Sequence, residues 1–294
     1  ESRRSREVYL GLARVKIITD STADLSPELI RKYDITVVPY VVNFESDSFQ
    51  DGVDISTAAL FEMVARRGML PKTSAPNLAQ FHRVFEDALK DADKVVYIGI
   101  SSKFSSGTPT AKLAAADFPE GKVTVIDSAN LSTGIGLQVL LACELAAAGK
   151  TAHDIASAIA DVIPRVKTSF IIDTLDYLRM GGRCSGVQAL VGSLLQIRPV
   201  ISVVDGGMVV SGKVRGPRKK ALDKLLDDFR ANSARVVPDR VFVTHTGCHE
   251  DALYLKDGIR KAAPAIREVL ETTAGAVIAS HCGPNTIGIL YIVE

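Results

Sequence analysis

The chain has no tryptophan, few aromatic residues and almost no net charge, and each of these limits what it can bind. Its 294 residues include no Trp and 6% aromatic residues, and the formal net charge is +1. Proteins that stack bases need aromatic platforms, and proteins that bind phosphate backbones carry a large positive charge. The composition therefore argues against nucleic acid or an anionic membrane as the main partner.

Cysteine and long apolar runs are also scarce. Cys143, Cys184, Cys248 and Cys282 lie far apart, and no two form a Cys-x-x-Cys pair. Such spacing is typical of reduced thiols in a cytoplasmic protein. No apolar run approaches the ~20 residues of a membrane-spanning helix. The expected location is therefore the cytoplasm.

Several catalytic motifs are missing. Gly134-Ile135-Gly136 lacks the third glycine of a dinucleotide fingerprint, and no Walker phosphate loop occurs. Gly99-Ile100-Ser101 lacks the closing glycine of a hydrolase nucleophile elbow. We therefore expect no nucleotide, no cofactor and no self-contained kinase activity.

The length predicts two domains, at 14–165 and 166–294. Residues 1–13 read as a flexible tail or an expression remnant, because they contain three arginines and no apolar signal segment. In the first domain, strands alternate with helices, which predicts a mainly parallel sheet flanked by helices. Strands are expected at 15–19, 36–44, 94–100 and 122–126, with helices beginning at Ser26, at 56–67, at 77–90 and in two Ala-rich segments.

The second domain mixes hairpins with helices, which predicts an α+β two-layer arrangement. Strands are expected at 168–172, 200–204, 208–214, 240–245, 276–281 and 286–293, and helices at 217–231 and 250–262. Asp205-Gly206-Gly207 predicts a hairpin turn. Two further helices are expected on either side of Gly181-Gly182-Arg183.

The Gly181-Gly182-Arg183 turn is the most informative segment. Glycine permits close approach of the backbone, the next helix would offer free N–H groups, and the guanidinium is always charged. Together they predict a receiver for phosphate or carboxylate. The alternative is an ordinary helix-ending turn with a solvated arginine.

Small hydroxyl-rich loops follow three strands of the first domain: Asp20-Ser21-Thr22, Ser105-Ser106-Gly107-Thr108 and Asp127-Ser128. Ligands of parallel sheets bind at the carboxyl ends of the strands, so these loops are candidate binding segments. A fourth loop, Pro71–Asn77, holds Thr73 and Ser74 between two prolines. Each loop could equally serve as a simple helix cap.

Histidines and cysteines in the second domain offer a metal alternative. His245, Cys248, His249 and His281 could hold zinc in a hydrolase, but their spacing matches no common zinc pattern, so no metal is expected. His281 is of interest for another reason. It is expected to end an apolar strand, where its imidazole could donate to an anion.

The ordered motifs resemble one family from about Val15 onward, the DegV family of bacterial proteins. The segments that carry the resemblance are 20–25, 73–76, 106–108, 125–128, 175–183, 192–199, 212–215 and 281–284. They include Leu-Asp-Tyr-Leu-Arg-Met-Gly-Gly-Arg and His-Cys-Gly-Pro. Each is weak alone, and their order and spacing make them jointly specific.

The resemblance implies the fatty-acid-binding subunit of a bacterial fatty acid kinase system. A single long-chain fatty acid, palmitate or similar, would be buried in the first domain, with its carboxylate near the domain interface. A separate kinase would supply ATP and form the acyl phosphate, so this chain would have no catalytic residue of its own. Transient contact with a membrane surface is compatible with such a carrier. Carried over by position, the carboxylate would bind at Thr73, Ser74, Ser106, Gly107 and His281, while Arg183 and Arg215 would face the phosphate or the kinase.

The sequence departs from the family pattern in two places. An extra serine, Ser105, and Pro109 interrupt the usual Leu-Ser-Gly-Thr-Tyr, which leaves open whether Ser105 or Ser106 meets the carboxylate. Cys282 replaces a small or β-branched residue. The main alternative function is an enzyme that acts on a small phosphorylated or carboxylated metabolite at the domain interface, with His281 as its acid or base.

Overall fold

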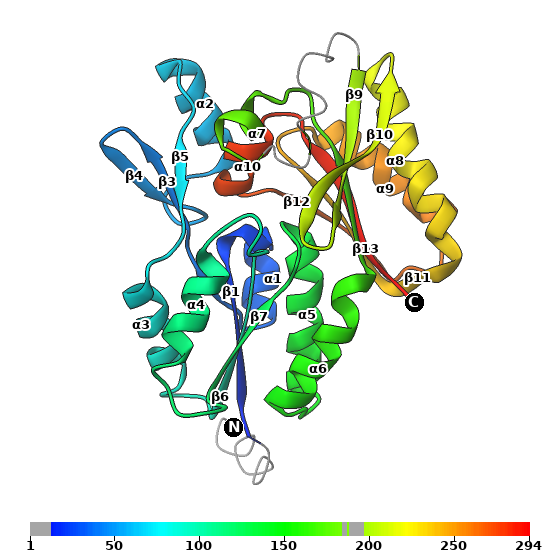
Figure 1. Ribbon diagram of the computed structural model, residues 1–294. Coiled ribbons are helices and arrows are strands. Elements are labelled where there is room, and N and C mark those ends of the chain that lie inside the picture. Colours follow the sequence, from blue (N-terminus) through cyan, green and yellow to red (C-terminus); the bar gives the residue numbers. More distant parts are fainter. Residues whose placement is uncertain (1–12, 184–186, 188–196) are drawn as a thin grey trace, which may run out of the picture.

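The computed structural model describes residues 13–183, 187 and 197–294, which form a mixed α/β fold with two principal sheets (Figure 1). A four-stranded sheet comes from the first half of the chain and a six-stranded sheet from the second half. We call these halves, with their helices, the first and second lobes. A domain boundary at 165 stays a prediction.

The first sheet is parallel, with strand order β2-β1-β6-β7. Its strands are β1 (Val15–Asp20), β2 (Thr36–Val38), β6 (Lys94–Gly99) and β7 (Val123–Asp127). Its helices are α1 (Pro27–Lys32), α3 (Leu78–Ala88), α4 (Gly107–Ala115), α5 (Thr133–Ala147) and α6 (Ala152–Val162). Of these, α6 was not foreseen in the sequence.

Two pairs of helices cover the two faces of this sheet. Tyr97 of β6 packs with Phe81 and Phe85 beneath α3 and α4, while Val96 and Ile98 face the core under α5 and α6. This alternation follows from the two-residue period of a strand. The N-termini of the helices follow the expected signals, because Ser26 caps α1 and Asn77 forms a capping box on α3.

A small antiparallel sheet stands beside the first sheet, with order β4-β3-β5. It consists of β3 (Val41–Phe44), β4 (Asp47–Gln50) and β5 (Lys72–Ser74), and α2 (Thr57–Arg67) lies between β4 and β5 in the chain. The sequence indicated one β-rich segment at 36–44. Pro39 divides it, because proline cannot donate to a strand ladder, so β2 and β3 belong to different sheets.

The six-stranded sheet has the order β10-β9-β8-β13-β11-β12 and is antiparallel except for the β11–β12 pair. Its strands are β8 (Val166–Ile171), β9 (Ile197–Val204), β10 (Gly207–Arg215), β11 (Val236–His245), β12 (Glu268–Thr273) and β13 (Ile287–Val293). The helices of this half are α7 (Asp176–Met180), α8 (Arg218–Asn232), α9 (His249–Ala262) and α10 (Ala276–Cys282). Short 3₁₀ turns occupy η2 (Ser21–Ala23), η3 (Ile163–Arg165) and η5 (Ser233–Arg235).

The two lobes share a core around α5. Helices α8 and α9 cover one face of the second sheet, and the other face joins α5 in the main hydrophobic cluster (Figure 1). Because α5 lies between two sheets, it is apolar nearly all round and its residues are mostly buried. None of the helices within the described ranges is long and apolar enough to cross a membrane.

The expected strand at 276–281 is wrong, because these residues form helix α10. The segment Ala-Val-Ile-Ala-Ser-His-Cys is buried almost throughout, so it has no polar face to reveal a helical period. A short apolar run of this kind fits a buried strand and a buried helix equally well. The strand is instead β12, at 268–273. The helix expected after Arg183 falls largely on 184–186 and 188–196, outside the described residues.

Candidate functional site

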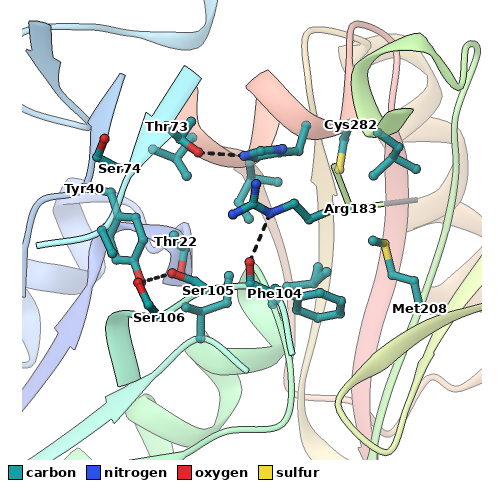
Figure 2. Close-up of a pocket in the computed structure, with 17 residues that line it drawn as sticks. Thr22, Tyr40, Thr73, Ser74, Phe104, Ser105, Ser106, Arg183, Met208 and Cys282 are labelled. Carbon is teal, nitrogen blue, oxygen red and sulfur yellow. Dashed lines mark hydrogen bonds between the residues drawn. The ribbon is translucent and has the colours of Figure 1, made fainter. Parts of the chain in front are cut away.

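A cavity of about 330 Å³ lies between the two lobes (Figure 2). Its lining is mostly apolar, with hydroxyl groups, one arginine and one histidine among it. The lining residues are Thr22, Tyr40, Thr73, Ser74, Ala75, Ile100, Phe104, Ser105, Ser106, Leu131, Leu178, Arg183, Met208, Val277, Ile278, His281 and Cys282. Both lobes contribute apolar side chains, and the burial of an acyl tail in the first domain stays a prediction.

Thr73 and His281 form the polar centre of this cavity, although 208 residues separate them in the chain. Thr73 lies on β5, His281 lies in the last turn of α10, and Thr73 Oγ1 is 2.7 Å from His281 Nε2 (Figure 2). His281 Nδ1 is buried and has no hydrogen-bond partner among the described residues. Gly181 packs against this nitrogen, so the imidazole meets the cavity through Nε2 and the Thr73 hydroxyl.

The imidazole of His281 is neutral at pH 7. Burial, reinforced by the positive charge of Arg183, lowers the pKa of His281 from 6.5 to about 4. A neutral imidazole donates one hydrogen bond and accepts another. When Nε2 donates to Thr73 Oγ1, the threonine hydroxyl keeps its own proton for a carboxylate, and no second full charge stands beside Arg183.

Arg183 enters the cavity from the turn that follows α7. Its Nε donates to Phe104 O at 3.1 Å, and its Nη1 donates to Gly181 O at 2.6 Å (Figure 2). The first of these bonds joins the two lobes across the cavity. The neighbouring Arg179 pairs with Asp176, whereas no carboxylate of the described chain forms an ion pair with Arg183. A partly buried cation with no counter-ion favours an anionic ligand.

Gly181 makes room for the imidazole. A β-carbon at this position would lie 2.2 Å from His281 Nδ1. Since this is far inside van der Waals contact, a residue other than glycine would displace the imidazole or move α10 away from α7. The glycine of the turn was expected to allow close approach of a ligand, and here the group that approaches is His281.

Ser105 and Ser106 differ in what they can offer a ligand. Ser105 Oγ lies 2.9 Å from Tyr40 Oη and accepts a hydrogen bond from the Gly107 N–H at 3.1 Å. The Ser106 hydroxyl makes no hydrogen bond among the described residues, and Ser106 stands at the N-cap of α4 without capping it. Ser106 thus keeps its donor for a ligand, whereas the Gly107 N–H is already used by Ser105.

The structure brings together most of the residues predicted from the sequence. Thr73, Ser74, Ser106, Arg183 and His281 line one cavity, and Gly107 adjoins it. Arg215 is exposed at the end of β10 and does not line the cavity. The roles of all these residues toward a carboxylate stay predictions.

Two of the three strand-end loops border the cavity, through Thr22 and through Ser105 and Ser106. Asp127 instead accepts hydrogen bonds from the backbone of Ser102 and Ala129, which is a structural role. Sequence reasoning missed Tyr40 and the apolar lining from Leu131, Met208, Val277 and Ile278. Tyr40 directly follows Pro39 in a β-rich segment, and that interruption was the only signal available.

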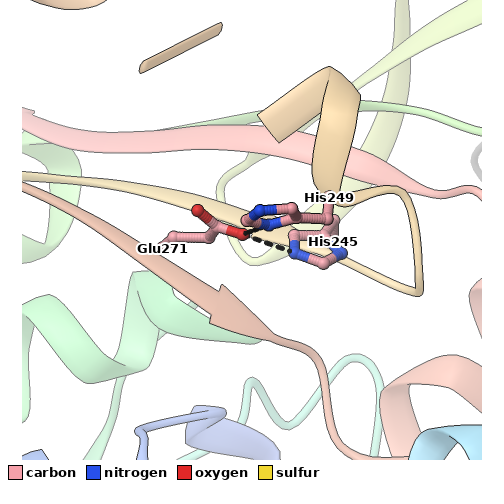
Figure 3. A group of neighbouring side chains, drawn as sticks. All are labelled: His245, His249 and Glu271. Carbon is pink, nitrogen blue, oxygen red and sulfur yellow. Dashed lines mark hydrogen bonds and ion pairs between the residues drawn. The ribbon is translucent and has the colours of Figure 1, made fainter. Parts of the chain in front are cut away.

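The four residues of the zinc alternative do not come together. His281 lies in the cavity, and Cys248 Sγ faces Thr286 O. His245 and His249 instead meet Glu271 of β12, and their ligand atoms lie within 4.8 Å of one another (Figure 3). His245 Nε2 lies 3.2 Å from Glu271 Oε1, and Lys256 Nζ donates to Glu271 Oε2 at 2.9 Å.

Hydrogen bonds at this cluster favour an ion pair over a metal. His245 Nδ1 accepts the backbone N–H groups of Gly247 and Cys248, at 3.1 and 3.2 Å. A neutral imidazole must then carry its proton on Nε2, the atom that faces Glu271. Metal-bound histidines normally donate from the other ring nitrogen, which is the opposite arrangement. The surrounding donors lower the pKa of Glu271 to about 2 despite its burial.

Comparison with known proteins identifies the family. A family model described as "Uncharacterised protein, DegV family" matches residues 14–294. This chain belongs to the DegV family. A DegV domain-containing protein from Deinococcus radiodurans is 37% identical over 276 residues, which cover 94% of this chain and 97% of the relative. One from Caldanaerobacter subterraneus subsp. tengcongensis is 33% identical, over 95% of this chain and 99% of its own length.

Solved structures of DegV family proteins share the fold. One from Thermus thermophilus, described as "Fatty Acid Binding of a DegV family Protein", has a TM-score of 0.90 and 34% identity, and the match covers 96% of this chain and 100% of that one. DegV from Bacillus subtilis, described as a fatty acid binding protein, has a TM-score of 0.85 and 28% identity, over 96% and 100% of the two chains. These similarities confirm the expected α/β fold of the DegV family.

The low pKa of His281 predicts how stability depends on pH. Unfolded protein binds a proton at this residue below pH 6.5, whereas the folded protein binds it only below about 4, so acidification between these values destabilises the fold. The shift corresponds to about 3 kcal/mol of unfolding free energy. We expect His281→Gln to remove this loss. The unfolding free energy of the variant should then fall less steeply than that of the wild type as the pH is lowered from 6.5 to about 4. Urea unfolding at several pH values measures both slopes.

Asp51 also changes the stability with pH, and its effect must be separated from that of His281. Burial raises the pKa of Asp51 from 3.8 to about 6, so its contribution has the opposite sign and stabilises the fold as the pH falls. Because Asp51 is present in both proteins, its effect cancels in the comparison. Equal slopes for the wild type and His281→Gln would show that His281 is not buried in its neutral form.

Proposed function

We propose that this chain binds one long-chain fatty acid in the cavity between the lobes and presents its carboxylate to a separate ATP-dependent kinase. The observation that carries the proposal is a mostly apolar cavity with Arg183, His281 and Thr73 gathered on its wall. The acyl chain would occupy the apolar part, where each buried methylene contributes about 0.8 kcal/mol. The carboxylate would meet Arg183 and the donors beside it.

The donor set suits a carboxylate better than a phosphate. A buried carboxylate needs a counter-charge and several hydrogen bonds, because an unpaired charge is costly to bury. Arg183 supplies the charge, and neutral donors are available from the hydroxyls of Thr73, Ser74 and Ser106, with His281 bonded to Thr73. A phosphate would favour more than one cation, and Arg183 is the single basic side chain among the residues that line the cavity.

The kinase part of the proposal has separate support. The sequence has no phosphate-binding loop, so ATP would come with the partner. The fatty acid that the kinase would act on is supported separately, because DegV relatives whose descriptions name fatty acid binding match this chain over nearly its full length. Arg215, exposed on β10, is the residue we propose to face the kinase or the transferred phosphate.

Mass spectrometry of the freshly purified protein tests the proposal. Native spectra should show protein with one bound fatty acid, and organic extraction after denaturation should release it in a one-to-one ratio. Protein that is free of lipid, and stays so after incubation with fatty acids of several lengths, would overturn fatty acid binding. That result would favour an enzyme for a small carboxylated or phosphorylated metabolite, which would turn over substrate without a partner.

The kinase step needs its own measurement. A purified bacterial fatty acid kinase with ATP should form acyl phosphate, trapped as a hydroxamate, only when the lipid-loaded chain is present. Arg215→Ala should lower the rate of this reaction without changing the amount of bound lipid. Lipid binding with no acyl phosphate would leave a carrier and overturn the kinase partnership.

A further inference from the structure

The geometry points to Asp24 and Asp51 as positioning residues that hold His281 in the cavity through the opposite end of helix α10. This inference rests on the proposed function, because it assigns a role in fatty acid binding to residues outside the lining of the cavity. Both carboxylates belong to the first lobe, whereas α10 comes from the second half of the chain.

Helix α10 lacks a cap of its own. It has seven residues, and its N-cap is Gly275, which has no side chain to satisfy the first N–H groups. Short helices are marginal in isolation and leave several backbone donors unpaired at the N-terminus. Partners from elsewhere in the fold must therefore supply what the local sequence does not.

Asp24 and Asp51 supply these partners. The Gly275 N–H donates to Asp24 Oδ1 at 2.8 Å, and the Ala276 N–H donates to Asp51 Oδ1 at 2.7 Å. Both aspartates are buried, with 6% and 2% of their surface exposed.

The contact depends on glycine at position 275. A β-carbon there would lie 2.9 and 3.0 Å from the oxygens of Asp51 and 3.2 Å from Asp24 Oδ1. Both carboxylates thus pack directly against the helix start. Thr57 adds a third link from the first lobe, because its hydroxyl donates to the carbonyl of Ala274.

The other end of α10 carries the functional group. His281 lies about two turns beyond Gly275 and hydrogen-bonds Thr73 of the first lobe. Helix α7 packs alongside α10, and Gly181 contacts the imidazole from that side. The helix is therefore fixed at both ends, and its start determines where His281 stands.

A cation site at these carboxylates is the competing interpretation, and the hydrogen bonds disfavour it. Asp24 uses one oxygen for Gly275 and the other for the hydroxyl of Ser132. Asp51 Oδ2 is the one carboxylate oxygen of the pair with no partner among the described residues. One open oxygen is too few for a hard cation, which needs six or more ligands.

A double-mutant cycle tests the positioning role. Dissociation constants for a fluorescent long-chain fatty acid are measured for the wild type, Asp51→Ala, His281→Gln and the double variant. We expect Asp51→Ala to weaken binding on the order of tenfold, the scale of a lost helix cap. In the His281→Gln background, Asp51→Ala should weaken binding less than about twofold, because the histidine that Asp51 positions is gone. An undiminished loss in that background would overturn the role.

Conservative and control variants separate positioning from general damage. Asp51→Asn keeps an oxygen for the Ala276 N–H and should restore most of the affinity. Asp54, three residues further along and exposed, accepts from the Gln50 backbone, and Asp54→Ala should bind as the wild type does. Equal losses in Asp51→Asn and Asp51→Ala would contradict a role that depends on the acceptor.

A spectroscopic readout completes the test without a ligand. The chain has five histidines, so each imidazole can be assigned by substitution in ¹⁵N spectra. Asp51→Ala should shift or broaden the resonance of His281 and leave those of His82 and His153 in place. An unmoved His281 resonance would overturn the positioning role even if affinity falls. Wild-type protein that takes up no fatty acid would instead overturn the proposed function, whatever the spectra show.

Discussion

Arg183→Ala is expected to weaken fatty acid binding by about 30-fold or more, the usual scale for removing one partner of a buried charge pair. Arg183 is the one arginine or lysine among the described residues that line the cavity, so the carboxylate of the ligand would be left without a counter-charge. The variant also loses the bond from Nε to Phe104 O, one of the links between the lobes. Titration with a fluorescent fatty acid measures the loss.

Arg179→Ala is the matched control for this prediction. Arg179 lies four residues earlier, in helix α7, and pairs with Asp176 on the surface, where 60% of its side chain is exposed. Exposed pairs of this kind contribute little to stability. The control should therefore bind as the wild type does. Similar affinities for Arg183→Ala and the wild type would show that the carboxylate does not lie at Arg183.

Gly181→Ala is expected to lower fatty acid affinity on the order of tenfold or more by displacing His281, since overpacking costs about 1–3 kcal/mol. The new β-carbon would lie 2.2 Å from Nδ1, so the imidazole or the whole of α10 must move. Gly181 has φ −73°, which alanine adopts freely, so the cost is steric. The measurement is affinity by fluorescence titration, together with stability by urea unfolding.

Gly182→Ala provides the contrast at the next position. Gly182 has φ +71° and open space around its α-carbon, so alanine meets backbone strain and no neighbour. We expect this variant to lose roughly 1 kcal/mol of stability and to keep its affinity. If the two alanine variants lost affinity equally, the turn itself would matter and the contact with His281 would not.

The sequence predicted the fold where local signals agreed. Ser26 and Asn77 marked helix starts that the structure confirms, because these caps act within three residues. It failed at 276–282, where the cap comes from Asp24 and Asp51, more than 220 residues away in the chain. No local pattern reports such a partner. β12 was missed because this edge strand, Glu-Val-Leu-Glu-Thr-Thr, has only two apolar residues and so lacks an apolar run.

The site was predictable as a set of parts, but its arrangement was not. The Gly-Gly-Arg turn, the Thr73-Ser74 loop and His281 were each visible as polar or glycine-rich segments, and family resemblance joined them. The contact between Gly181 and His281 depends on the packing of α7 against α10, and the sequence gives no measure of that packing. The apolar lining, such as Leu131 and Met208, resembles any other core residue until the cavity is seen.

The position of α10 has a consequence for how the protein can be divided. The helix belongs to the second half of the chain, yet its hydrogen-bond partners lie in the first half. The N–H groups at its start donate to Asp24 and Asp51, and His281 in its last turn pairs with Thr73. A fragment that begins at Val166 would keep β8 to β13 and lose every one of these partners. The two halves therefore act as a single cooperative unit, and a protease that cut between them would release neither half intact until α10 had withdrawn.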